Sequence, residues 1–98
     1  MIKIEVTRKN GNIKQVCFKG HALYDEYGKD IVCSAVSSIV ITTINAILSI
    51  NDKAISYSEN PLIIEVLNND EITYKLINNM ISLLKELECD YPDNIKFL

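Results

Sequence analysis

A run of 20 residues without a charged side chain, residues 31–50, constrains the fold more than any other feature of the sequence. Its length is about that of a helix that crosses a lipid bilayer. At helical spacing, however, the run divides into two stripes. One is mostly apolar (Val32, Val36, Ile39, Thr43, Ile47 and Ile50), and the other is largely polar (Ser34, Ser38, Thr42, Asn45 and Ser49). We therefore predict the core helix of a soluble protein, buried on most of its circumference, rather than a membrane span.

The residues before this helix predict a β-hairpin followed by a loop. Apolar and charged residues alternate over residues 1–6, as in a strand with one buried face. Asn10 and Gly11 form a pair that favours a tight turn with positive φ, and residues 13–19 predict the returning strand. Residues 21–29 have no clean periodicity. We predict a loop there, with a glycine hinge at each end, Gly20 and Gly28.

The second half of the chain predicts two strands, a helix and a short final strand. The strands cover residues 53–57 and 61–67, the helix covers residues 68–89, and the last strand covers residues 94–98. The apolar face of this helix is predicted to consist of Leu76, Met80, Leu83, Leu84 and Leu87. The order ββαββαβ indicates an α+β fold, with two helices packed on a largely antiparallel sheet. A length of 98 residues is typical of one domain, so we assign residues 1–98 to a single domain.

Charge and cysteine content exclude several classes of function. The net charge is −3, so we expect no direct nucleic-acid binding. The polar stripe of residues 31–50 predicts that the chain also has no membrane partner. The first residues lack an apolar signal region, which predicts a cytoplasmic protein with its three cysteines reduced. One histidine and three widely separated cysteines lack the paired spacing of a metal site, and no P-loop or dinucleotide-binding motif is present. We therefore predict no metal and no cofactor.

Two residues stand out as candidates for chemistry, the single histidine, His21, and Cys33 in the first turn of the predicted helix. Unpaired N–H groups and the positive end of the helix dipole favour a thiolate at such a position. A buried cysteine there is instead an inert small apolar residue, and spacing alone leaves both interpretations open. Cys17, within a strand, and Cys89, at the end of a helix, are interpreted as unreactive.

These residues lie in a block that resembles the ribosomal-processing cysteine protease family Prp. The family pattern is G-H-A, a short loop, and then G-x-D-I-V-C-(A/S)-A-V-S. It matches Gly20-His21-Ala22 and then residues 28–37, from Gly28 to Ser37. Only residues 20–37 are specific, although the predicted order of strands and helices fits the family over essentially the whole chain. Ser34, where many members carry alanine, is a small departure that keeps the side chain short.

The resemblance implies a bacterial cysteine endopeptidase with a Cys–His dyad. Such an enzyme removes a short N-terminal extension from large-subunit ribosomal protein number twenty-seven and cuts after an aromatic residue. The family is also described as dimeric, so a homodimer is expected. In this chain Cys33 matches the nucleophile and His21 the general base, while Asp30 and Ser37 match polar positions beside them. Free N–H groups of the first helical turn are candidate oxyanion donors.

Several assignments stay open at this stage. Asp30 either caps the helix or orients His21, and Ser37 either serves catalysis or packs the helix. Five residues are predicted to bind substrate around an aromatic-accepting groove: Gly20, Leu23, Tyr24, Tyr27 and Gly28. The competing functions are a non-catalytic ribosome-associated binding module with an inert Cys33 and a redox-sensing thiol protein. The second would need a resolving cysteine close to Cys33, and the sequence offers none nearby.

Overall fold

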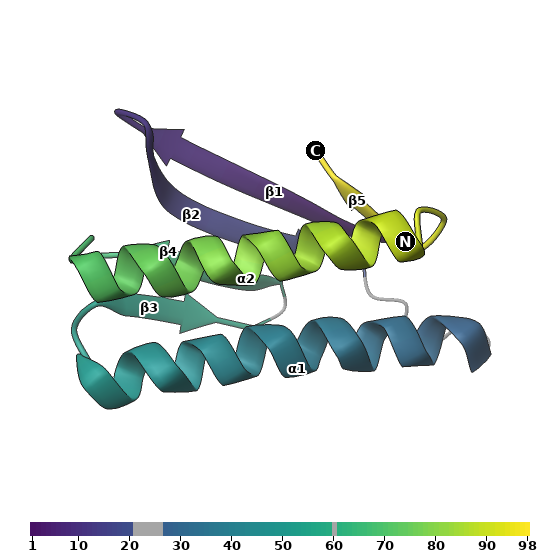
Figure 1. Ribbon diagram of the computed structural model, residues 1–98, viewed down its shortest axis with the longest axis horizontal. Coiled ribbons are helices and arrows are strands. Elements are labelled where there is room, and N and C mark those ends of the chain that lie inside the picture. Colours follow the sequence, from purple (N-terminus) through teal and green to yellow (C-terminus); the bar gives the residue numbers. More distant parts are fainter. Residues whose placement is uncertain (21–26, 60) are drawn as a thin grey trace.

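The computed structural model describes the backbone of residues 1–20, 27–59 and 61–98, and the side chains of residues 1–20, 31–59 and 61–98. The elements follow the predicted order ββαββαβ (Figure 1). They are β1 (Ile2–Lys9), β2 (Asn12–Lys19), α1 (Tyr27–Ile50), β3 (Ile55–Ser58), β4 (Leu62–Val66), α2 (Glu71–Asp90) and β5 (Ile95–Phe97). The strands at residues 53–57, 61–67 and 94–98 are therefore present but shorter than predicted.

The strands form one sheet in the order β3-β4-β2-β1-β5. Every neighbouring pair is antiparallel except β1 and β5, which are parallel, so the predicted largely antiparallel sheet is confirmed with one parallel edge. The β1–β2 turn contains Asn10 at φ 54° and Gly11 at φ 82°. These positive values confirm the turn predicted from the Asn-Gly pair.

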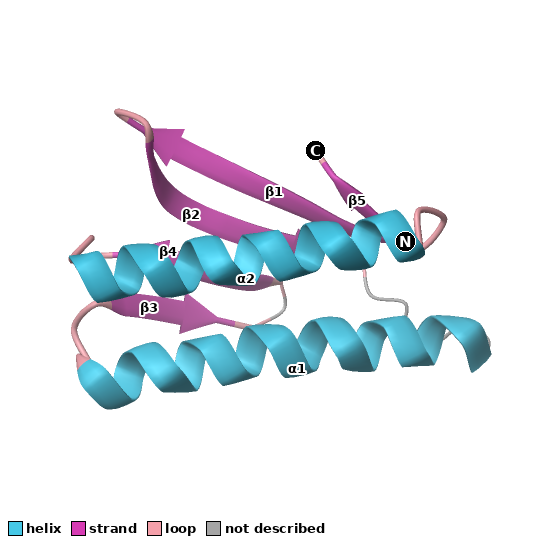
Figure 2. Cartoon of the chain, in the orientation of Figure 1, coloured by secondary structure: helices cyan, strands magenta, loops and turns pink. Residues whose placement is uncertain are grey.

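The two helices lie side by side, in opposite directions, on the same face of the sheet (Figures 1 and 2). The core fills the space between the two layers. Its fully buried members come from the sheet (Ile4, Val16, Ile64 and Ile95), from α1 (Val32, Val40 and Ile47) and from α2 (Ile77, Met80 and Leu84). The fold is therefore a two-layer α+β sandwich, as expected.

Helix α1 begins earlier than the sequence predicted. It starts at Tyr27, so Gly28 lies inside the helix rather than at a loop hinge. Asp30 is the fourth helical residue and not the N-cap, and Cys33 lies in the second turn rather than the first. A glycine lowers helix stability by only about 1 kcal/mol, and residues 27–30 contain no proline that would stop the helix.

Helix α1 is also buried over a narrower face than predicted. By length and apolar composition alone, Ile31–Ile50 qualifies as a membrane span, and only 39% of its most apolar window is buried. The predicted polar stripe is exposed throughout, and most of the apolar stripe is buried. Three isoleucines are nevertheless in contact with solvent: Ile31 is 65% exposed, Ile41 47% and Ile50 57%.

Helix α2 begins after Asp70, whose side chain accepts a hydrogen bond from the backbone N–H of Thr73 at 2.8 Å. This bond lowers the pKa of Asp70 below its ordinary value. The predicted face was partly wrong, because Ile77 and Ile81 are buried whereas Leu83 is 39% exposed. The helix therefore buries the row Ile77, Ile81 and Leu84. Because α2 has several apolar residues in succession, the sequence does not decide which row is buried.

Candidate active site

Cys33 lies in the second turn of α1 and is 7% exposed. Residues three, four and seven positions further along, Val36, Ser37 and Val40, share its face of the helix. This face is directed at the end of β2, where the chain leaves the sheet. The placement follows from the long apolar face of α1, which fixes the rotation of the helix against the sheet.

A small apolar cavity of about 40 Å³ opens beside Cys33. It lies where α1 meets the ends of three strands. Its lining comes from β1 (Ile2), β2 and the residue that follows it (Phe18, Lys19 and Gly20), α1 (Cys33, Val36, Ser37 and Val40) and β4 (Leu62). Because Phe18 and Leu62 are directly opposite each other in the β2–β4 register, these two side chains form one wall.

Gly20 ends the strand with φ +74°, a left-handed conformation that side chains with a Cβ rarely adopt. A Cβ at this position would overlap the backbone carbonyl oxygen of Met1. Gly20 therefore brings the chain past β1 at a distance that only glycine permits. It directly precedes His21 and lines the Cys33 cavity, so the predicted substrate-site residue Gly20 lies at the candidate site.

Ser37 is exposed and lines the same cavity as Cys33. The helical spacing had predicted that the two residues share one face of the helix.

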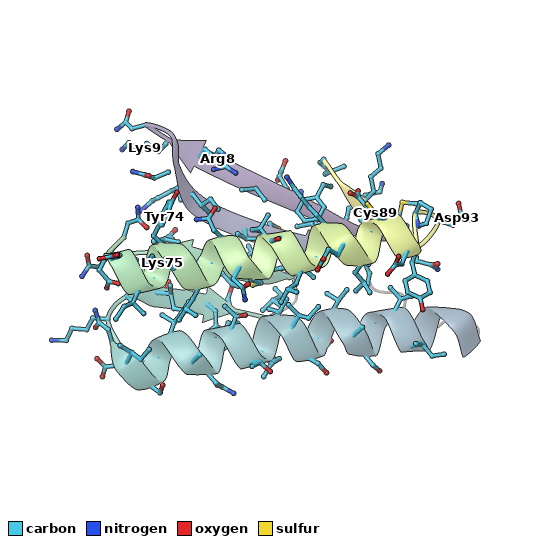
Figure 3. All side chains as sticks on the ribbon, in the orientation of Figure 1. Arg8, Lys9, Tyr74, Lys75, Cys89 and Asp93 are labelled. Carbon is cyan, nitrogen blue, oxygen red and sulfur yellow. The ribbon has the colours of Figure 1, made fainter. Side chains whose placement is uncertain are left out.

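The other two cysteines lie elsewhere. Cys17 is buried in β2 between Glu5 of β1 and Ile63 of β4, on the strand face opposite to the core residues Val16 and Phe18. Cys89 is exposed at the C-terminal end of α2 (Figure 3). Neither lines the cavity.

The remaining predicted site residues fall outside what the structure describes. His21, Leu23 and Tyr24 lie in the undescribed segment 21–26. Tyr27 and Asp30 belong to the α1 backbone, and their side chains are outside the described set. Their predicted roles therefore stay predictions. Among the described residues, no group of three His, Cys, Asp or Glu side chains is placed to hold a metal ion.

Sequence reasoning missed the strand residues of the cavity, Ile2, Phe18 and Leu62. Their approach to Cys33 depends on the β2–β4 and β1–β2 pairings, and pairing between distant segments leaves no local signal. Val36 and Val40 were within reach of the sequence, because both follow Cys33 at helical spacing.

The model of the family described as cysteine protease Prp matches residues 1–96. The chain belongs to this family. A ribosomal processing cysteine protease Prp from Staphylococcus aureus is 31% identical, with 98% of this chain and 96% of the relative covered. The corresponding protein of Bacillus subtilis is 32% identical, with 79% and 77% covered. The predicted Prp resemblance and the assignment to a cysteine-type peptidase are thus confirmed.

Solved Prp structures share the fold over the whole chain. The Staphylococcus aureus protease Prp in complex with a substrate peptide has a TM-score of 0.91 and 25% sequence identity, and the match covers 100% of this chain and 98% of the Staphylococcus aureus chain. The same protease with a covalently linked product peptide has a TM-score of 0.84 and 29% sequence identity, and the match covers 99% of this chain and 97% of the other. The two-helix, mixed-sheet architecture is therefore that of a Prp protease.

Proposed function

We propose that the chain is an endopeptidase that removes the short N-terminal extension of large-subunit ribosomal protein number twenty-seven, with Cys33 as nucleophile and His21 as general base and acid. The proposal rests chiefly on one observation, the position of Cys33 in a cavity whose wall includes Gly20, the residue bonded to His21. The relatives named as ribosomal processing proteases and the family pattern around both residues support the same chemistry.

Amide hydrolysis by a thiol requires few protein groups. The thiolate attacks the carbonyl carbon, and an acid then protonates the leaving amine to give an acyl-enzyme, which water hydrolyses. Among side chains only that of histidine has an ordinary pKa near neutrality, and the sequence holds one histidine, His21. The Prp homologue with a covalently linked product peptide is consistent with an acyl-enzyme route.

The decisive test is Cys33→Ala, assayed with a synthetic peptide that spans the extension and the first residues of the host's mature ribosomal protein. We expect cleavage to stop while the fold, followed by circular dichroism, is kept. Cys17→Ser and Cys89→Ser are matched controls and should keep activity, because neither residue lines the cavity. Turnover by Cys33→Ala would refute the assignment and favour the non-catalytic binding module.

We also propose cleavage after an aromatic residue. The cavity beside Cys33 is apolar, as a site for a ring requires, but its volume of about 40 Å³ is smaller than the roughly 150 Å³ cavity that holds benzene. The proposal therefore requires the wall at Leu62 to move, with Leu23, Tyr24 and Tyr27 completing the pocket. Peptides that end in Phe or Ala before the cut test it. Burying one ring stabilises by about 2–3 kcal/mol, so roughly 30–150-fold preference for Phe is expected, and equal rates would exclude the pocket.

We propose a homodimer that pairs the outer faces of two α1 helices. The exposed face of α2 carries charged residues, including the Glu71–Lys75 ion pair, whereas residues 31–50 of α1 carry none and expose Ile31 and Ile41. An uncharged face can meet its own copy without repulsion between like charges. Ile41→Lys should shift the mass measured by light scattering from dimer to monomer. A wild-type mass of one chain would exclude the dimer.

A cytoplasmic location completes the proposal. Its support is that all three cysteines are free, and a reducing compartment keeps thiols in that state. Fractionation of cells that produce a tagged chain tests the location, and recovery outside the cytoplasmic fraction would contradict it.

A further inference from the structure

We propose that the hydroxyl of Ser37 is the oxyanion donor of this site. The inference rests on the proposed function, since it assigns Ser37 a task in the attack by Cys33. Thiolate attack turns the carbonyl oxygen of the scissile bond into an oxyanion, and a preorganised hydrogen-bond donor aimed at that oxygen accelerates the step.

The start of α1 removes the donors that the sequence indicated. In an α-helix the N–H of each residue bonds to the carbonyl four positions earlier, and only the first four N–H groups stay free. Because α1 begins at Tyr27, the N–H groups of Cys33 and Ser34 lie inside the helical hydrogen-bond ladder, where their partners are the carbonyls of Lys29 and Asp30. A donor for the oxyanion has to come from another part of the cavity wall.

Ser37 is placed to serve as this donor. It lies four residues after Cys33 on the same helix face, and helical side chains lean toward the preceding turn, which here is the turn of Cys33. Both residues line the same cavity. The other side-chain donor on the wall, the charged ammonium of Lys19, forms an ion pair with Glu5 at 3.6 Å.

The Ser37 hydroxyl is also available, since it has no hydrogen-bond partner among the described residues. Two other hydroxyls of α1 are occupied by the helix itself, whereas those of Ser38 and Thr42 also have no hydrogen-bond partner among the described residues. Thr43 donates to the carbonyl oxygen of Ile39 at 2.8 Å, and Ser49 donates to that of Ala46 at 2.8 Å. Back-bonding is one of the two common arrangements of a helical serine or threonine, and an unbonded hydroxyl is the other. The Ser37 hydroxyl differs from those of Ser38 and Thr42 because it lines the cavity of Cys33, whereas they line the hollow between α1 and α2.

The proposed step conserves atoms and charge. The sulfur lone pair of Cys33 forms the S–C bond, and the π electrons of the carbonyl move to its oxygen. The Ser37 O–H donates a hydrogen bond to this oxyanion and keeps its proton. When the carbonyl re-forms, the C–N bond breaks and His21 gives its proton to the departing amine, which leaves the acyl-enzyme.

The test compares Ser37→Ala with the matched control Ser38→Ala in two reactions. Ser38 is the next residue, is exposed, and lines a different hollow, between α1 and α2. Peptide cleavage passes through an oxyanion, whereas alkylation of Cys33 by iodoacetamide needs the thiolate but no oxyanion. We expect kcat for the peptide to fall roughly 10²–10³-fold in Ser37→Ala, with KM nearly unchanged.

The alkylation rate of Cys33 and its pH profile should be the same in Ser37→Ala as in wild type, and Ser38→Ala should match wild type in both reactions. Ser37→Thr, which keeps the hydroxyl, should recover most of kcat. Cleavage by Ser37→Ala at the wild-type rate would overturn the proposal and point to a backbone donor at Gly20. A parallel loss of alkylation would overturn it in favour of a structural role. Failure of the proposed function itself is separate, because it appears as cleavage by Cys33→Ala.

Discussion

Substitution of Gly20 by alanine tests whether a close backbone approach holds the candidate site together. Gly20 has φ +74°, and its Cα faces the carbonyl oxygen of Met1 with no room for a Cβ. Gly11 provides a matched control, because it has a similar φ of +82° but open space where a Cβ would be. The two positions share the conformational strain and differ in the steric overlap.

The expected magnitudes follow from this difference. A left-handed conformation costs a residue with a Cβ roughly 1–2 kcal/mol, and this cost applies to both alanine variants. Gly20→Ala must also displace the backbone of Met1, the residue before β1, and overpacking of this kind typically costs about 1–3 kcal/mol more. Gly11→Ala should therefore lose about 1–2 kcal/mol of unfolding free energy and Gly20→Ala about 2–5 kcal/mol. A domain with ordinary stability still folds after either change.

Urea unfolding measures the two free energies, and cleavage of the extension peptide measures the effect on the site. We expect Gly11→Ala to cleave at the wild-type rate, because the hairpin turn lies far along β1 and β2 from the cavity. Gly20→Ala should lose most activity at a urea concentration where it is fully folded, since the displaced strand end carries His21. Asparagine tolerates positive φ, so Gly11→Asn should be nearly neutral while Gly20→Asn keeps the overlap. Equal stability and equal activity of the two alanine variants would refute the reasoning.

Three further predictions concern the dyad, a helix cap and the core. The cleavage rate should rise and then fall with increasing pH, because the reactive Cys–His pair exists only in an intermediate pH range. His21→Ala should lose most of the cleavage rate, and a rate in this variant within a few-fold of wild type would remove His21 from the mechanism. The hydrogen bond from the Thr73 N–H lowers the pKa of Asp70 in the folded protein. The ionised Asp70 therefore contributes to stability at a pH above its pKa in the unfolded chain, about 3.9, and this contribution is lost as the pH falls through its pKa in the folded protein. Asp70→Asn should flatten the decline of the melting temperature between about pH 5 and pH 2, and an unchanged decline would contradict this. Met80 is fully buried, so Met80→Ala should cost about 2–5 kcal/mol in urea unfolding, and a loss below about 1 kcal/mol would mean that the core repacks.

The local sequence was sufficient for features that depend on neighbouring residues. The Asn10-Gly11 turn, the alternation in β1 and the two stripes of residues 31–50 each report a local geometry, and the structure confirms them. The motif over residues 20–37 was equally sufficient for the Prp family, because the residue types needed for the chemistry lie close together in the chain.

Features that depend on packing between distant segments required the tertiary structure. Helix α1 starts at Tyr27, although the local pattern places the start at Asp30, and this difference moves Cys33 away from the free N–H groups. The orientation of α2 was similarly ambiguous, because Leu83 and Ile81 are both strongly apolar and only tertiary packing decides that Ile81 is buried and Leu83 exposed.

The candidate site shows the same division. Its two candidate reactive residues, Cys33 and His21, were proposed from the sequence, whereas its walls were not. Phe18 and Leu62 meet because β2 pairs with β4, and Gly20 approaches Met1 because β1 lies beside β2. Phe18 and Leu62 are 44 positions apart in the sequence and become neighbours only through strand pairing. No local sequence preference determines which residues of two distant strands pair. The proposed chemistry therefore follows from a short motif, whereas the shape of the cavity beside Cys33 was decided by the pairing of the sheet.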